Sequence, residues 1–164
     1  MRGETAMKRH TISITISVLT LAFVLAPGSL FGQDTRGVTG VGKASLPAGT
    51  SLSGVSLTGL LFGMGVYIPG DGTSAGSLQV SLPGTTVLGQ AQTIEVTGTA
   101  ASGTINIDGT RTFSGTATVD MGDGTPPLTA VPFSVIASAT GIILSVATTT
   151  LPAATLTSGV IQIQ

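Results

Sequence analysis

The stretch GLLFGMGVYI, residues 59–68, decides the fold class, because its large apolar side chains occupy every second position. In an extended chain successive side chains point to opposite faces, so this period gathers one set of them together. The apolar face carries Phe62, Met64, Val66 and Ile68, and the opposite face carries Gly63, Gly65 and Tyr67. The pattern predicts a half-buried β-strand.

The same alternation recurs along the rest of the chain, with Gly, Pro or Asp between the runs. Further runs begin at Gly76, Thr93, Gly103, Arg111, Pro132, Ile142 and Ser158. No stretch after residue 32 keeps apolar residues at the helical period of 3.6 for three turns. Short strands at this spacing predict an all-β fold, an antiparallel β-sandwich of about eight or nine strands over residues 43–164.

The composition agrees with a sheet protein that is rich in turns. Glycine accounts for 24 of 164 residues, about twice its usual share. Glycine in a helix interior costs about 1 kcal/mol, so this content disfavours long helices. Charged residues make up only 8% of the chain and hydrophobic residues 41%. A disordered chain needs the opposite balance, so the sequence predicts a folded domain.

The first 32 residues are typical of a secretory signal peptide. Basic residues precede an apolar run over 12–26, which Pro27 and Gly28 interrupt. We expect cleavage after Gly32, a flexible lead-in over 33–42, and a protein that is secreted or held at the cell surface or in the periplasm. The alternative is an uncleaved anchor over 12–31, although a membrane span needs about 20 apolar residues. After cleavage we expect no stable membrane span.

Removal of the signal would leave three basic and six acidic side chains, and no His, Cys or Trp. Such a chain lacks the basic patch of nucleic-acid-binding proteins. Without His and Cys, the Ser-His-Asp and Cys-His nucleophiles and the usual zinc sites are excluded. A Ser-Lys pair through Lys43 remains formally open, but its neighbours Ala44 and Ser45 indicate a solvated strand residue. The sequence therefore predicts no enzyme activity and no required cofactor, and calcium is the one cofactor that it leaves open.

The triplet Asp-Gly-Thr occurs three times, at residues 71–73, 108–110 and 123–125. Each copy stands where one alternating run stops and another follows. Glycine adopts a positive φ without steric cost, and Asp accepts a hydrogen bond from the backbone two residues on. Because Asp-Gly between strands is a strong hairpin signal, we expect three tight turns.

The middle copy also predicts a register for its hairpin. A two-residue loop would pair Ile105 with Thr112, and a three-residue loop ending at Thr110 would pair Ile105 with Phe113. A shift of one residue turns every side chain to the other face, so burial of both apolar residues favours the three-residue loop. Ile107 shares the predicted apolar face of Ile105.

The segment MGDGTPP, which follows Asp120, has a second interpretation, because Asp120 and Asp123 place two carboxylates close together. Calcium takes about six to eight oxygen ligands, so a site would need Asp71 or Asp34 brought in by the fold. The EF-hand spacing is absent. A calcium site at Asp71, Asp120 and Asp123 is therefore the alternative to a turn. Tyr67, on the face away from the core, is a candidate binding contact.

Two patterns resemble known families. TATVDMGDGTPP, residues 116–127, resembles the V-D-x-G-D-G-T segment of bacterial Ig-like and PKD-like surface modules, with Met121 in place of the usual aromatic residue. A longer pattern is similar to the post-COAP type of secreted all-β domain. It comprises Phe62-Gly63, Gly76-x-Leu78-x-Val80, Ile94-x-Val96-x-Gly98, Asp108-Gly109 with Phe113, Asp120 and Phe133-x-Val135. Both resemblances imply a bacterial surface setting and no catalytic residues.

These observations lead to one main functional hypothesis and one alternative. We expect an exported, non-enzymatic structural or adhesive module of the bacterial cell envelope or surface, whose partners are copies of itself or other surface proteins. Low charge weakens repulsion between copies, and residues 160–164 form a strand with no charge to guard an edge. The alternative is a calcium- or carbohydrate-binding extracellular module, based on Asp120, Asp123 and Tyr67.

Overall fold

A computed structural model describes residues 36–164, which form strands and turns with no helix among them. The eleven strands are β1 (Gly37–Ser45), β2 (Ser51–Leu52), β3 (Val55–Leu57), β4 (Leu60–Tyr67), β5 (Thr73–Thr85), β6 (Ala91–Ile105), β7 (Arg111–Asp120), β8 (Leu128–Ser138), β9 (Gly141–Val146), β10 (Thr149–Thr150) and β11 (Ala154–Ile163). A search of this part of the chain for an apolar helix of membrane-spanning length finds none.

All the strands belong to one antiparallel hydrogen-bonded sheet. Each strand in the order β2-β3-β5-β4-β1-β11-β9-β8-β7-β6 bonds to the next, and β6 also bonds to β5. That last pairing closes a circuit of the longer strands and leaves the short β2, β3 and β10 outside it. The predicted all-β antiparallel class is confirmed. The finer prediction of a β-sandwich, with two separate sheets, is not confirmed by this continuous sheet.

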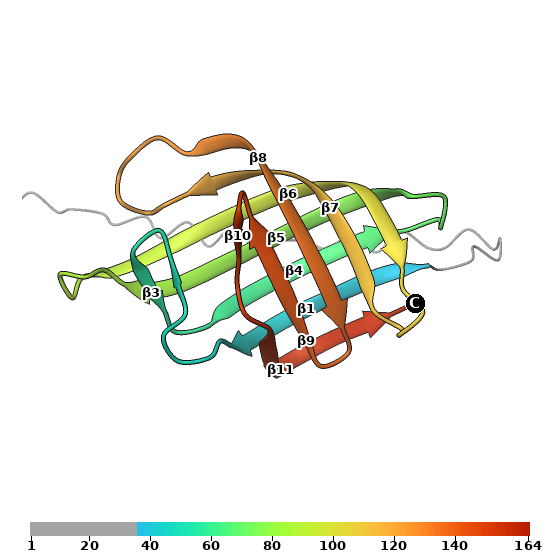
Figure 1. Cartoon of the computed structure of the whole chain (residues 1–164), viewed down its shortest axis with the longest axis horizontal. Coiled ribbons are helices and arrows are strands. Elements are labelled where there is room, and N and C mark those ends of the chain that lie inside the picture. The colour runs from blue at the N-terminus through green and yellow to red at the C-terminus, as the bar shows by residue number, and fades with distance from the viewer. Residues whose placement is uncertain (1–35) are drawn as a thin grey trace, which may run out of the picture. The chain divides into compact units, whose positions relative to one another are not determined.

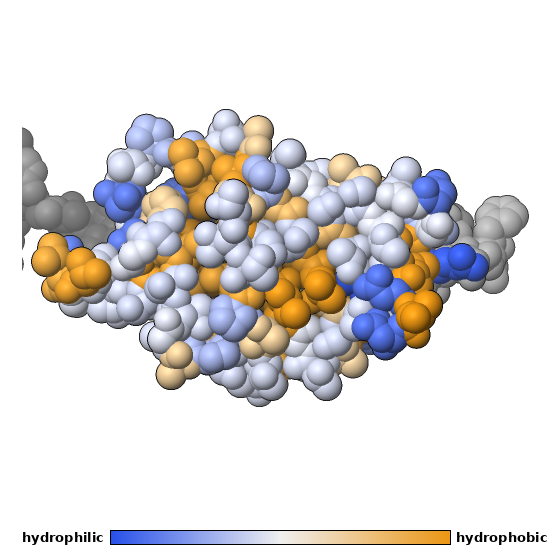
Figure 2. All heavy atoms as spheres, viewed as in Figure 1, coloured by the Kyte–Doolittle hydropathy of each residue, from blue (hydrophilic) through white to orange (hydrophobic). Residues whose placement is uncertain are grey.

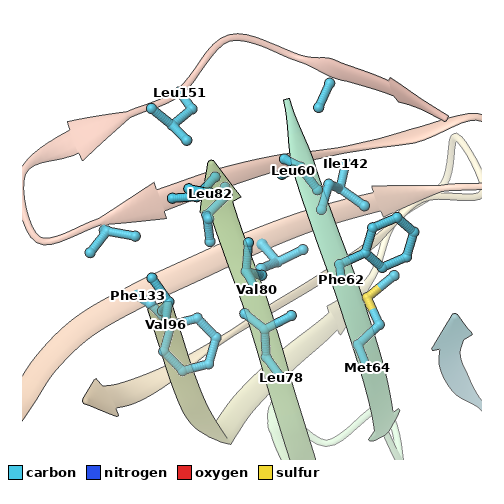
Figure 3. Close-up of a cluster of buried hydrophobic side chains, with 14 of the residues drawn as sticks. Leu60, Phe62, Met64, Leu78, Val80, Leu82, Val96, Phe133, Ile142 and Leu151 are labelled. Atoms are coloured by element: carbon cyan, nitrogen blue, oxygen red, sulfur yellow. The ribbon is translucent and has the colours of Figure 1, made fainter. Parts of the chain in front are cut away.

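The circuit folds the sheet into two layers around one core. Figure 1 shows β7, β8 and β9 crossing in front of β1, β4 and β5. Figure 3 shows side chains of both layers pointing toward one another, among them Phe62 and Met64 of β4, Leu78 and Val80 of β5 and Phe133 of β8. Each of these is at most 7% exposed. The inward face predicted from the period of two is therefore confirmed along these strands.

The core packs closely where β6 lacks a side chain. A Cβ at Gly98 would lie 2.6 Å from Cε1 of Phe133, so the absence of a side chain there makes room for the ring. The rings of Phe133 and Phe113 meet edge-on, with centroids 6.2 Å apart and an interplanar angle of 77°. Aromatic pairs favour this edge-on arrangement. It joins β7 to β8, and the ring of Phe133 lies against Gly98 of β6.

The folded body starts earlier than the sequence predicts. β1 begins at Gly37, and Val38 is fully buried, so residues 37–42 are strand and not a flexible lead-in. Glycine is common in linkers, but here Gly37 lies so close to β4 that a Cβ would collide with the carbonyl oxygen of Val66. The predicted signal peptide over 1–32 and residues 33–35 of the lead-in lie outside the described residues.

The register predicted for the β6–β7 hairpin is wrong. Ile105 pairs with Arg111, and Phe113 pairs with Gly103. Phe113 is nevertheless fully buried, because a shift of two residues keeps a side chain on the same face.

The loop of this hairpin spans residues 106–110 because Asn106 and Thr110 close it. The Asn106 N–H donates to the Thr110 carbonyl oxygen at 3.0 Å, and Nδ2 of Asn106 donates to the Thr110 hydroxyl at 2.8 Å. Ile107 consequently lies in the loop and is fully exposed, contrary to the prediction that it shares the buried face.

The C-terminal strand is not the unguarded edge that the sequence suggests. Residues 158–163 of β11 pair with residues 38–43 of β1, and Ala154 and Thr155 pair with β9. β11 therefore lies within the circuit, between β1 and β9.

Candidate functional site

The three Asp-Gly-Thr segments share one hydrogen-bond geometry. In the β4–β5 turn, Oδ1 of Asp71 accepts a hydrogen bond from the Thr73 N–H at 2.9 Å and from its hydroxyl at 2.6 Å. The segments 108–110 and 123–125 repeat both bonds, at 2.9 and 2.7 Å and at 2.9 and 2.6 Å. The three central glycines have positive φ, of 93°, 84° and 84°. The predicted role of these segments as turns is confirmed.

The same bonds stabilise the charged form of each aspartate. In every copy the threonine, through its hydroxyl and its backbone N–H, lowers the pKa of the aspartate below its ordinary value. The hydroxyl contributes most at Asp71 and Asp123, and the backbone N–H contributes most at Asp108. A carboxylate that accepts two hydrogen bonds is harder to protonate, so these groups are acceptors that hold backbone turns.

The two carboxylates of the β7–β8 connection both bind their own backbone. Oδ1 of Asp120 accepts a hydrogen bond from the Gly122 N–H at 2.8 Å, as Oδ1 of Asp123 does from the Thr125 N–H at 2.9 Å. Gly122 has a φ of 68°, which bends the chain between the two. Both side chains thereby shape the connection.

The structure separates Asp71 from the other two carboxylates considered as calcium ligands. Asp120 pairs with Glu95 at one end of β6, whereas the turn that contains Asp71 adjoins Ser102 further along the same strand. Residues 95 and 102 are roughly 20 Å apart at the rise of a strand. Within residues 36–164, no three His, Cys, Asp or Glu side chains form a group that could hold a metal ion. The set Asp71, Asp120 and Asp123 is therefore not brought together.

Hydroxyl groups cover the outer face of the β6–β7 hairpin. The outward cross-strand pairs are Thr97–Thr118, Thr99–Thr116, Ser102–Ser114 and Thr104–Thr112. Within this ladder the hydroxyls of Ser102 and Ser114 hydrogen-bond at 2.8 Å. From Ser114 the row of hydroxyl groups continues onto β8, β9 and β10 through Ser134, Ser145 and Thr150. This face carries many hydrogen-bonding groups, and its charged pair, Glu95–Asp120, lies beyond Thr97–Thr118.

A shallow depression of about 680 Å³ lies on the other layer, on the outer face of β1, β4 and β5. Gly63 forms its floor, where an added Cβ would meet no atom within 4 Å. Val41 and Leu61 supply apolar walls and are 63% and 47% exposed. Gln79 of β5 faces Gly63 across the pairing and adds an amide. The depression thus combines a recess, aliphatic surface and one hydrogen-bonding side chain.

Charged side chains lie at the margins of this depression. Lys43, Leu61, Ser81 and Glu95 follow one another across β1, β4, β5 and β6 in a single outward row. The Ser81 hydroxyl donates to Oε1 of Glu95 at 2.7 Å. One positive and one negative group therefore flank the apolar centre.

Tyr67 lies where the sequence predicts, on the outer face of β4 and 50% exposed. Gly63 and Gly65 precede it on the same face, and a Cβ at either would meet no atom within 4 Å. Lys43 is likewise an exposed strand residue, as expected. The role of Tyr67 as a binding contact stays a prediction.

Neither the hydroxyl face nor the depression was predicted from the sequence. For the hydroxyl face a signal exists, because Ser and Thr occupy alternate positions over 112–118 and, with one extra residue at the bulge before Ser102, over 97–104. The depression has no such signal, since it depends on the register that sets Val41, Gly63 and Gln79 side by side.

Comparison with known proteins adds no relative to this description. No protein-family model matches the chain, and no curated protein or solved structure matches it either.

Proposed function

We propose that this protein is an exported, non-enzymatic structural or adhesive module of a bacterial surface. The observation that carries the proposal is the chemistry of its outer faces, where hydroxyl groups and glycine occupy most of the outward positions of β6, β7 and β4. Surfaces with few charges repel one another weakly, so many copies pack at high density.

Several of the charged groups serve the fold itself. The aspartates at 71, 108 and 123 each bind their own turn. Nε and Nη2 of Arg111 donate to the backbone carbonyl oxygen of Gln164 at 3.1 and 2.6 Å, which ties β7 to the end of β11. Such a surface favours contact over an area and not recognition of a charged ligand.

The ionisable groups support the absence of enzymatic chemistry. Residues 33–164 contain no His and no Cys. A carboxyl group that acts as a general acid at neutral pH needs a raised pKa. In the three turns the pKa of Asp71, Asp108 and Asp123 is lowered, which is the opposite direction.

Two measurements test the proposal. The mass of protein collected outside the cytoplasm, after expression of the full chain, should correspond to loss of residues 1–32. Light scattering of the purified protein should show a mean mass that rises with concentration. A strict monomer at high concentration would count against a structural role through self-association.

One observation favours a second candidate function, the binding of a neutral carbohydrate. The bare backbone at Gly63 and Gly65 leads to the exposed ring of Tyr67, a flat surface on which a sugar ring stacks. Ser77 and Gln79 face the two glycines from β5 and supply hydrogen-bonding groups. In co-sedimentation with insoluble polysaccharides, Tyr67→Ala should lower the bound fraction and Tyr67→Phe should retain it.

A further inference from the structure

The β5–β6 hairpin ends in two large aliphatic side chains that do not belong to the core. Val87 and Leu88 are 89% and 82% exposed. Figure 2 shows a hydrophobic patch at the place where this hairpin ends in Figure 1. The turn closes through backbone bonds, from the Gly89 N–H to the Thr86 carbonyl oxygen and from the Thr86 N–H to the Gln90 carbonyl oxygen, both at 2.9 Å. Neither aliphatic side chain is needed to form it.

The depression on β1, β4 and β5 offers a surface of matching chemistry. Val41 and Leu61 line it, and Val160 stands beside Val41 on β11 with 49% exposure. The recess over Gly63 is open to a side chain from another molecule. Exposed aliphatic residues thus gather at two separate places, a protruding tip and a recessed face, which indicates contact with other molecules.

We propose that the tip of the β5–β6 hairpin, residues 86–90, docks into the depression of a second copy of this chain. Leu88 and Val87 lie over Gly63 of the neighbour, between its Val41 and Leu61. Because tip and depression are different surfaces, the contact is head-to-tail and repeats from copy to copy into an open chain. This inference rests on the proposed structural function and names the contact through which it works.

Charge favours a second copy over an anionic lipid surface. No charged residue lies between 85 and 92, and the depression is flanked by Lys43 and Glu95, one of each sign, so the two surfaces do not repel each other. Nε2 of Gln92, at the base of the hairpin, donates to the Met121 carbonyl oxygen at 2.6 Å. The connection that it touches carries carboxylates, which an anionic membrane would repel.

The size of the contact sets its strength. Stable complexes bury roughly 1,200–2,000 Å² in total, and a five-residue tip supplies less than that area. A single contact is therefore transient. It becomes effective where copies are crowded, because mass action raises the occupancy of a weak contact at high concentration.

Two variants with matched controls test the contact by sedimentation velocity over a concentration series, using protein purified after expression of the full chain. The tip variant, Leu88→Asp with Gln90→Thr, copies the side chains of the 106–110 turn, and its control is Ile107→Asp in that turn. The floor variant, Gly63→Val, fills the recess, and its control is Gly65→Val. A Cβ at either glycine would meet no atom within 4 Å on the same strand face, so we expect both variants to fold.

The expected result is wild-type association beyond the dimer, with the apparent dissociation constant weakened at least about tenfold in the tip and floor variants and unchanged in the controls. A mixture of the two variants should stop at the dimer, because it has one intact tip and one intact depression per pair. Association that neither variant changes would overturn the docking contact and leave the proposed function standing. A strictly monomeric wild type would remove the self-association on which both depend. Loss of binding to vesicles of anionic and neutral lipid in the tip variant, with association intact, would identify a bilayer as the occupant and also overturn the proposal.

Discussion

Two five-residue turns of this sheet share one backbone conformation but differ in side-chain chemistry at their first, third and fifth residues. The second residue of each, Val87 and Ile107, is an exposed aliphatic residue. In residues 86–90 and 106–110 the fourth residue donates its N–H to the carbonyl oxygen of the first, and the first donates to the fifth. The fourth residue is glycine in both, with φ of 78° at Gly89 and 84° at Gly109. The backbone therefore reaches the same conformation twice.

The side chains of the two turns act differently. In 106–110, Asp108 and Asn106 both bind the hydroxyl of Thr110, and the turn holds its own polar groups. In 86–90 the hydroxyl of Thr86 accepts a hydrogen bond from the Gln90 N–H at 3.2 Å, and the tip is aliphatic. Glycine and two backbone hydrogen bonds therefore suffice to form the turn, which leaves the tip side chains free for another use.

The largest effect should come from the glycine that both turns require. A β-branched side chain at a positive φ is strained, so we expect Gly89→Val and Gly109→Val each to lower the free energy of unfolding by about 1–2 kcal/mol. Urea denaturation measures both. Gly63→Val, in open space at an ordinary φ, should change little. Clearly unequal losses of stability in the two variants would show that the two turns do not depend on their glycine in the same way.

A smaller effect should separate the turns. Asn106→Ala removes hydrogen bonds to the hydroxyls of Thr110 and Thr112, at 2.8 and 2.9 Å, and should cost about 1 kcal/mol. Thr86→Ala removes one longer bond at an exposed site and should cost less than half of that. Thermal unfolding of the two variants side by side decides the point. Equal losses would show that the side chains contribute alike.

The β5–β6 and β6–β7 hairpins also differ in the hydrogen bonds that their side-chain hydroxyl groups make. Among the described residues, the buried Oγ of Ser74 on β5 has no hydrogen-bond partner, whereas the hydroxyls of Ser102 and Ser114 bond to each other. Ser74→Ala should therefore raise the free energy of unfolding by roughly 0.5–1 kcal/mol. Ser77→Ala, at an exposed position of the same strand, serves as the control in urea denaturation. A loss of stability in Ser74→Ala would indicate a bond that the structure lacks.

The smallest effect should be a difference in sensitivity to acid. The pKa of Asp108 is lower in the folded chain than in the unfolded one, so its contribution to stability is complete above the unfolded value of about 3.9. That contribution is lost as the pH falls below this value and through the folded pKa. Carboxyl NMR titration should show the pKa of Asp108 rising toward its ordinary value in Thr110→Val, which removes the hydroxyl donor.

The 86–90 turn has no titrating group, so a carboxyl group introduced there can be compared directly with Asp108. The double substitution Leu88→Asp with Gln90→Thr should give this turn one carboxyl group with a pKa below its ordinary value. If the new carboxyl group has an ordinary pKa, the hydroxyl and the backbone N–H of the new threonine do not donate to it as those of Thr110 donate to Asp108.

The predictions from sequence succeeded where neighbouring residues decide the structure. The period of two over residues 59–68 identified the buried side chains of β4, and the Asp-Gly-Thr triplets identified three turns. They failed where distant strands decide it. Residues 37–42 have the glycine content of a linker and became strand because β4 and β11 pair with them on either side. Ile105 faced Arg111 because Asn106 closed a longer loop.

The candidate surfaces divide in the same way. The hydroxyl face of β6 and β7 could have been predicted, because Ser and Thr recur at the outward positions of each strand. The depression around Gly63 was not, because its walls come from β1 and β5 and its existence depends on their register with β4.

From the sequence alone follow the antiparallel strands of this protein, the buried face of strands such as β4, and the places where aspartate and glycine bend the chain. These properties follow from local geometry, since alternation and positive φ involve residues next to one another. The tertiary structure alone shows that β11 pairs with β1 and closes the sheet, and that a bare glycine lies between aliphatic walls while an aliphatic tip protrudes elsewhere. Pairing between strands far apart in the chain is chosen by the fit of whole faces, which no single segment contains.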